Sequence, residues 1–169
     1  MICLLTERLV LEPPDARHIA EMRAITDDPD THRYLGGPQS AADHFTRMAR
    51  NAGSWQLYGY GGFAVTLRTS GATVGNVGVF HSWRGLGADV DDMPEAGWIL
   101  GRQFVGQGLA REAVTAALGW FDEVHRGRPI FCMIDPDNAP SLALAAHFGF
   151  VPLRDAQLGT APVRLLLRG

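Results

Sequence analysis

The stretch EAGWILGRQFVGQGLAREAV, residues 95–114, decides the fold. Its apolar run at residues 96–100 predicts a strand that is covered on both faces and therefore lies in the centre of a sheet. A turn with Gly106 and Gly108 follows, and apolar residues then recur at helical spacing along residues 110–121. A strand, a glycine-bearing turn and a helix in this order indicate an α/β domain.

The turn itself has the chemistry of an anion site. The first N–H groups of a helix have no partner within the helix, and they lie at the positive end of its dipole. Gly106 and Gly108 allow a ligand to approach the backbone closely, and Arg102 and Arg111 add positive charge on either side. The turn is thus either a phosphate site or an ordinary tight turn. A dinucleotide-binding fingerprint is excluded, because its third glycine would fall at Arg111.

The chain as a whole reads as one α/β domain with a mixed sheet over residues 1–169, because no linker, repeat or low-complexity segment interrupts it. In the helix expected at residues 40–51, Phe45 and Met48 should face the core. The expected strands are residues 8–11, 63–67, 73–80, 96–100, 130–134, 150–153 and 163–167, and the expected helices are residues 15–27, 40–51, 110–121 and 139–148.

The composition excludes several classes of protein. Of the 169 residues, 46% are hydrophobic and 20% are charged, which is typical of a folded domain. The net charge is −3 and no basic run is present, so we expect no nucleic-acid partner. All 15 basic residues are arginine. The absence of lysine excludes Schiff-base enzymes, P-loop nucleotide-binding proteins and protein kinases.

Cysteine usage and the N-terminal residues indicate whether a metal cofactor is expected and in which cellular compartment the protein lies. Cys3 and Cys132 show no metal-binding spacing, and Cys132 lies in an apolar run, so we expect no metal and a buried thiol. The apolar residues 1–5 are followed at once by charged residues and are too short for a signal peptide or a membrane span. We therefore expect a cytoplasmic protein without a membrane partner, either a monomer or a homodimer.

Three segments resemble the GNAT superfamily of acyl-CoA-dependent N-acetyltransferases, and they occur in the order of that family. Residues 103–108, QFVGQG, match the signature Q/R-x-x-G-x-G/A. Residues 138–150 resemble the family's N-x-x-S…L-G-F segment. Residues 6–11, TERLVL, are similar to the branch that contains the ribosomal-protein N-terminal acetyltransferases. The resemblance covers residues 6–168.

The resemblance implies a fold and an activity. The fold is the GNAT fold, a mixed and mostly antiparallel sheet of about seven strands flanked by about four helices, with splayed central strands that bind coenzyme A. The activity is the transfer of an acetyl group from acetyl-CoA to a primary amine, by direct attack in a ternary complex and without a metal. The acceptor is then the α-amine of a protein or peptide, or a small-molecule amine. The alternative is a non-catalytic acyl-CoA-binding or sensor domain of the same fold.

The resemblance also assigns coenzyme-binding residues. Backbone groups of Trp98, Ile99 and Leu100 would bind the pantetheine arm. Asn138 would bind the pantetheine or act only as a helix cap, and Ser141 would lie near the thioester sulfur or bond locally. The loop that holds the pyrophosphate would comprise Gln103, Gly106, Gln107, Gly108, Leu109 and Ala110.

Attack by an amine on a thioester requires a proton acceptor, and two residues are candidates. Glu95 begins the central strand, where the family commonly has a carboxylate, and His81 is the second candidate. Many relatives have a tyrosine four residues after the position of Ser141, as the acid toward the departing thiolate. Here that residue is Ala145, which leaves Ser141, water or no acid at all for this role.

The acceptor pocket is expected between the first two helices and the last hairpin. Tyr34, Trp55 and Trp83 are candidate walls of that pocket, although aromatic residues also belong to cores. The acidic residues within 27–30 either attract a cationic acceptor or lie in a solvated loop.

Overall fold

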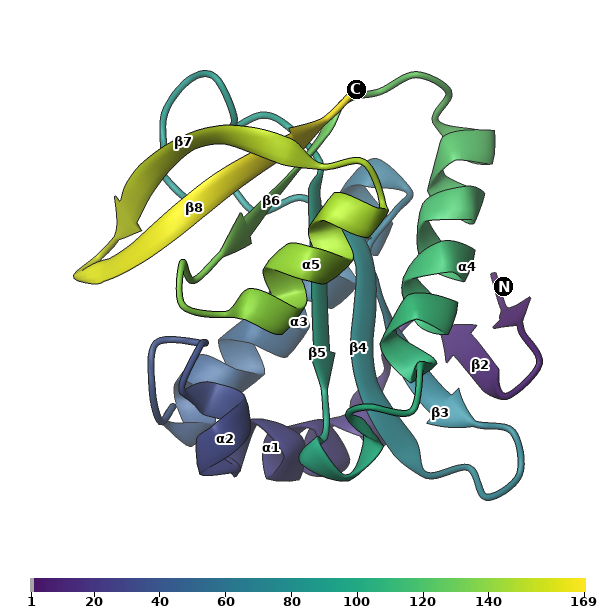
Figure 1. Cartoon of the computed structure of the whole chain (residues 1–169). Helices are drawn as coiled ribbons and strands as arrows, with labels where there is room; N and C mark the ends of the chain where they lie inside the picture. The colour runs from purple at the N-terminus through teal and green to yellow at the C-terminus, as the bar shows by residue number, and fades with distance from the viewer. Residues whose placement is uncertain (1) are drawn as a thin grey trace.

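A computed structural model describes residues 2–169 and shows one sheet with the strand order β1-β2-β3-β4-β5-β6-β8-β7 (Figure 1). Neighbouring strands are antiparallel except β5 and β6. The strands are β1 (Leu4–Leu5), β2 (Leu9–Glu12), β3 (Gly62–Leu67), β4 (Thr73–Phe80), β5 (Glu95–Leu100), β6 (Ile130–Ile134), β7 (Val151–Leu158) and β8 (Ala161–Arg168). The α-helices are α1 (Ile19–Asp27), α2 (Pro29–His32), α3 (Ala41–Tyr58), α4 (Leu109–Val124) and α5 (Ala139–His147), with 3₁₀ turns at Ala16–His18 and Arg102–Phe104.

Helices lie on both faces of the sheet, with α4 and α5 in front of β4 and β5 in Figure 1 and α3 behind them. Successive side chains of a strand point to opposite faces, and β5 shows this division clearly. Trp98 packs into the core cluster that includes the buried side of α4. Ile99 packs instead against Met22 of α1 and Met48 of α3. Strand β4 is buried along its whole length because it lies between the two layers.

The sheet opens between its two central strands. β4 and β5 pair along all of β5, from Glu95 to Leu100. β5 and β6 pair in parallel only at Glu95 with Phe131 and at Ala96 with Cys132. β6 remains paired with β8 up to Ile134. The two strands therefore diverge after Ala96, and the far half of β5 has no neighbour on that side.

The predicted fold class is confirmed, with eight strands and five α-helices in residues 2–169 rather than about seven and about four. The additional strand is the two-residue β1, which is too short to show a periodic pattern. The additional helix is α2, a single turn that begins at the N-cap Asp28. The last two strands are also longer than expected and form the β7–β8 hairpin.

No helix between residues 2 and 169 has the length and hydropathy that crossing a membrane requires.

Three local predictions were wrong. Phe45 is 59% exposed, because the buried stripe of α3 runs through His44, Met48 and Asn51 and leaves position 45 on the outer side. The same helix continues to Tyr58 instead of ending near residue 51. β5 is buried at Glu95 and Ala96 but only half-buried from Gly97 onward, because the sheet opens there. By contrast, Cys132 is buried, as expected, and the first turn begins at Asp15, which caps it.

Candidate functional site

A cavity of about 70 Å³ occupies the opening between β5 and β6. Its sides are residues 96–98 of β5 and residues 132–135 of β6 and the turn after it. Asn138 and Ser141 of α5 contribute to it as well, together with Tyr34 and Leu35 from the segment after α2. The cavity is therefore lined by the strand backbone that has lost its partner and by hydrogen-bonding side chains of α5.

The turn before α4 presents unpaired backbone donors beside this opening. Gly106 and Gly108 have φ angles of 79° and 77°, which L residues with a side chain rarely adopt. A Cβ atom at Gly106 would meet nothing within 4 Å, so the loop faces open space. No hydrogen bond within the described residues uses the N–H groups of residues 106–110, and no side chain caps α4. These groups and the helix dipole fit a pyrophosphate.

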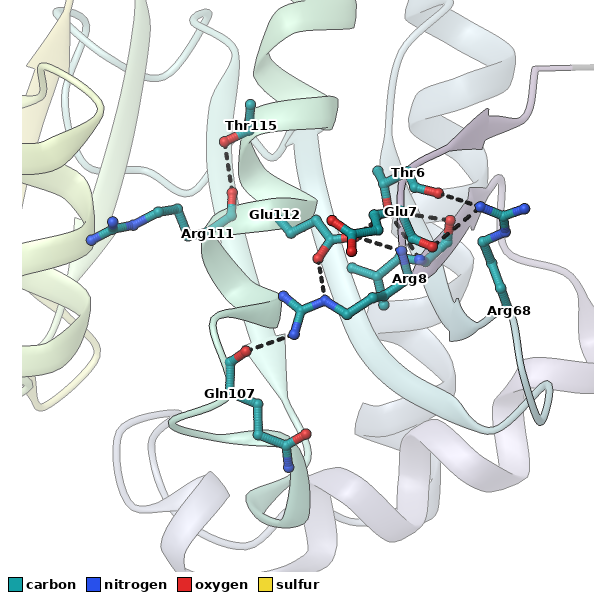
Figure 2. Close-up of polar contacts among 9 residues, drawn as sticks. Thr6, Glu7, Arg8, Arg68, Gln107, Arg111, Glu112 and Thr115 are labelled. Atoms are coloured by element: carbon teal, nitrogen blue, oxygen red, sulfur yellow. Dashed lines mark hydrogen bonds and ion pairs between the residues drawn. The ribbon is translucent and has the colours of Figure 1, made fainter.

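Arg8 fixes the orientation of this turn, and Figure 2 shows how it reaches both the loop and α4. Its Nη1 donates to the carbonyl oxygen of Gln107 at 2.9 Å, and its Nε donates to Glu112 Oε2 at 2.7 Å. In a trans peptide the C=O and the following N–H point in opposite directions. Because the carbonyl of Gln107 points toward Arg8, the N–H of Gly108 points away from it, to the side open to a ligand.

Glu112 is the centre of the contacts in Figure 2. Its Oε1 accepts from the Thr6 hydroxyl at 2.5 Å and from the Arg8 backbone N–H at 2.8 Å. Burial alone would raise the pKa of Glu112, but the hydrogen bonds from Thr6 and Arg8 hold it below its ordinary value. From the sequence, residues 6–11 indicated only a family resemblance and not this contact with α4. Thr6 and Arg8 bind Glu112, which lies more than 100 positions away in the sequence, so no local sequence pattern reveals this contact.

The two arginines expected to flank the turn behave differently. Arg102 forms an ion pair with Asp30 of α2, so its charge is used within the protein. Arg111 is exposed, points away from Arg8 in Figure 2, and its guanidinium has no ion pair or hydrogen bond with residues 2–169. Gln107 closes the loop, because its side chain donates to the Gln103 carbonyl at 2.7 Å.

Asn138 and Ser141 lie on the α5 side of the cavity, and both already have protein partners. Asn138 Oδ1 accepts from the Ser141 N–H at 3.2 Å and so caps α5. Ser141 Oγ accepts from Trp98 Nε1 at 3.1 Å, which links α5 to β5. Because the serine oxygen accepts from Trp98, its own O–H remains available to a group in the cavity. The Asn138 amide N–H₂ is also outside the cap.

Glu95 is buried on the α3 face of the sheet. Its Oε2 accepts from the Ser82 hydroxyl at 2.5 Å and from Arg84 Nε at 2.8 Å, and its Oε1 accepts from Arg84 Nη2 at 2.9 Å. A bidentate guanidinium partner stabilises the ionised carboxylate. Ser82 is half-buried, so its hydroxyl connects Glu95 to the space outside.

His81 also lies among protein partners. Its Nδ1 is 2.9 Å from the Tyr60 hydroxyl, and its Nε2 is 3.1 Å from Asp92. The ring stacks on Tyr58 with 4.0 Å between centroids. Burial lowers the pKa of His81, and the nearby Asp92 offsets part of this effect. Ala145, at the position where many relatives have tyrosine, is completely buried.

The three aromatic residues that were candidate walls of the acceptor pocket lie in three different environments. Tyr34 lines the cavity, as expected. Trp55 packs edge-on against Phe63 and donates to the Gly62 carbonyl, so it belongs to the core and not to the pocket. Trp83 is 59% exposed and donates to the Tyr58 hydroxyl. Within residues 2–169 no group of three or more His, Cys, Asp and Glu side chains is arranged to hold a metal ion.

Comparison with known proteins places these features in a family context. A family model described as "Acetyltransferase (GNAT) domain" matches residues 8–151. The structure of a GnaT-family acetyltransferase from Bordetella pertussis is 30% identical in sequence, and the match covers 100% of both chains with a TM-score of 0.89. An acetyltransferase from Agrobacterium tumefaciens strain C58 is 23% identical, with a TM-score of 0.86 over 100% of this chain and 95% of that one.

The similar structures also include ribosomal-protein acetyltransferases. One is RimL, a ribosomal L7/L12 alpha-N-protein acetyltransferase solved in complex with coenzyme A. It is 16% identical and has a TM-score of 0.74, and the match covers 98% of this chain and 96% of that one. The architecture described above is thus shared along the whole length of the chain.

Proposed function

Because the chain belongs to the GNAT family of acetyltransferases, we propose that it transfers an acetyl group from acetyl-CoA to a primary amine by direct attack in a ternary complex. The observation that carries this proposal is the opening of the sheet after Ala96, next to a turn whose N–H groups point outward. An opened strand offers hydrogen bonds to an extended amide chain, and the turn offers them to a diphosphate.

The residues around the opening fit coenzyme A. In this proposal the N–H groups of residues 106–110 hold the pyrophosphate, and Gln103 and Gln107 keep the loop closed. The unpaired backbone of residues 98–100 bonds the pantetheine arm, together with the free amide hydrogens of Asn138. Arg111 supplies a positive charge on the open side of α4. The coenzyme supplies the acetyl group as an activated thioester.

The protein contributes three chemical functions to the transfer. Unpaired N–H groups of β5 stabilise the negative charge that develops on the carbonyl oxygen. Ser141 donates a hydrogen bond to the departing sulfur, because its oxygen is held by Trp98. Glu95 accepts the proton of the amine through Ser82, whose hydroxyl joins the buried carboxylate to the outside.

The acceptor is the primary amine of a protein or peptide, or of a small molecule. The similarity to ribosomal-protein acetyltransferases supports the α-amine of a protein. Tyr34 and Leu35 lie where an acceptor would meet the cavity.

The competing function is a non-catalytic acyl-CoA-binding domain. Two observations favour it: Ala145 replaces the tyrosine acid, and Glu95 is ion-paired with Arg84. The two functions are separated by thiol release from acetyl-CoA in the presence of peptides with free N-termini, polyamines and aminoglycosides. The proposed function requires amine-dependent release with at least one class and an acetylated product by mass spectrometry. Coenzyme binding without turnover on any amine would support the competing function.

A further inference from the structure

Three arginines surround Glu95 on the face of the sheet that α3 covers. Side chains an even number of positions apart in a strand point to the same face, so Glu95 lies on the same side of β5 as Ile99, which packs against Met48 of α3. Arg47 and Arg50 lie one helical turn apart on α3, on either side of Met48. Arg84 approaches from the loop after β4 and binds Glu95 with two hydrogen bonds. We call Arg47, Arg50 and Arg84 the arginine cluster.

The cluster carries more positive charge than its surroundings neutralise. Arg47 Nη1 and Arg50 Nε are buried and have no hydrogen-bond partner among residues 2–169. Glu95 is the carboxylate whose charge acts on both, and Arg84 already occupies it. Burial, followed by repulsion from Arg50 and Arg84, lowers the pKa of Arg47 to about 10, which still leaves it charged at neutral pH. Three guanidinium groups therefore share one carboxylate.

Such an arrangement is completed by an anion. A guanidinium group presents donors in a planar fork that matches a carboxylate, and it stays protonated, so an added carboxylate both accepts these hydrogen bonds and offsets the positive charge. Arg47 and Arg50 are half-buried, so the rest of each side chain remains within reach of solvent. We propose that the arginine cluster binds a carboxylate of the acceptor, so that the preferred acceptor is an amine that carries a negative charge close to its amino group. This inference rests on the acetyl transfer proposed above.

The position of the cluster limits the distance between the two groups of the acceptor. The opening of the sheet starts after Ala96, and Glu95 lies one or two residues before it, which is roughly 3–7 Å along a strand. Because Glu95 directly precedes the residue at which the sheet opens, this proposal requires the acceptor's carboxylate to lie close to its amine. An acidic residue at the start of a peptide meets this requirement, and so does a free acidic amino acid.

The alternative of a cationic acceptor finds less support. Asp28 caps α2, and Asp30 forms an ion pair with Arg102. Asp27 lies within 3.4 Å of Arg23 on the same helix. The acidic residues of this region are thus engaged within the protein, whereas Arg47 and Arg50 each keep a buried donor without a hydrogen-bond partner among residues 2–169.

The test compares acceptors that differ only in charge. Thiol release is measured with the tripeptide amides Ser-Glu-Ala and Ser-Gln-Ala, and with free glutamate and glutaminamide. The inference predicts a kcat/KM that is roughly 10- to 100-fold higher for the charged member of at least one pair, the size expected from a hydrogen-bonded charge. A preference in the peptide pair assigns the carboxylate to an acidic peptide, and a preference in the other pair assigns it to a free amino acid.

Arg47→Gln and Arg50→Gln should each reduce this preference by about tenfold or more and leave the KM for acetyl-CoA unchanged. Arg126→Gln is the matched control, because Arg126 is exposed in the loop between α4 and β6 and its loss changes the net charge equally. As a measurement independent of turnover, malonate should raise the melting temperature of the wild-type protein but not of the Arg47→Gln/Arg50→Gln double variant.

Equal rates within both acceptor pairs, together with a malonate effect that does not depend on Arg47 and Arg50, would overturn the inference. Failure of the proposed function gives a different result. In that case no amine is acetylated, while malonate still stabilises the protein through Arg47 and Arg50, and the anion site is supported without the transfer.

Discussion

Glu95 is a buried carboxylate whose two oxygens already accept hydrogen bonds, and Glu95→Gln tests whether it also accepts the proton of the amine. The amide keeps the shape but loses basicity, so kcat should fall, at most by the ~10²–10⁴-fold typical of general base catalysis. The loss should shrink as the pH approaches the pKa of the acceptor, because a free amine needs no base. Ser82→Ala, which leaves the Arg84 pair intact, should give a smaller effect with the same pH dependence. If both variants keep full activity at every pH, the base is His81 or water.

Asn138 has one carbonyl oxygen in the cap of α5 and an amide group that faces away from it. Asn138→Ala should therefore lower the melting temperature and also weaken coenzyme A binding by about 1 kcal/mol, the contribution of one hydrogen bond. Ser40→Ala is the matched control, because Ser40 caps α3 and lies outside the proposed coenzyme site. Calorimetric titration with coenzyme A separates the two effects. A loss of stability with unchanged affinity would reduce Asn138 to a helix cap.

At the scale of elements, Glu112 joins the N-terminal segment to α4, and its depressed pKa makes this link dependent on pH. The carboxylate is ionised in both states at pH 7, and its stabilisation is lost as the pH falls from 4.5 through the lower folded-state value. Glu112→Gln should lower the free energy of unfolding at pH 7 by about 1–2 kcal/mol, and much less at pH 3. Urea unfolding at both pH values measures this, with the exposed Glu123→Gln as the control. An equal difference at both pH values would contradict the ionic link.

For the whole molecule, the sequence predicted those parts of the fold that depend on local pattern. The strand at residues 96–100, the glycine turn and the helix after it were correct, because apolar spacing and glycine conformation are local properties. The opening of the sheet was expected only from the family resemblance, since no residue pattern marks where β5 leaves β6. The arginine cluster was not predicted at all. Arg84 and Glu95 are far from Arg47 and Arg50 in sequence, and the missing partners of Arg47 and Arg50 are a property of the packed structure.

Calorimetric titration of Gly108→Asp with coenzyme A shows whether the turn before α4 holds the pyrophosphate of the coenzyme. The aspartate places a side chain and a negative charge beside the N–H groups of residues 106–110, so binding should be abolished. Gly127→Asp is the matched control, because Gly127 has a φ of 66° and open space around it, in an exposed loop beyond α4. We expect unchanged affinity for Gly127→Asp and no detectable binding for a folded Gly108→Asp protein. Wild-type affinity in Gly108→Asp would contradict this role of the turn.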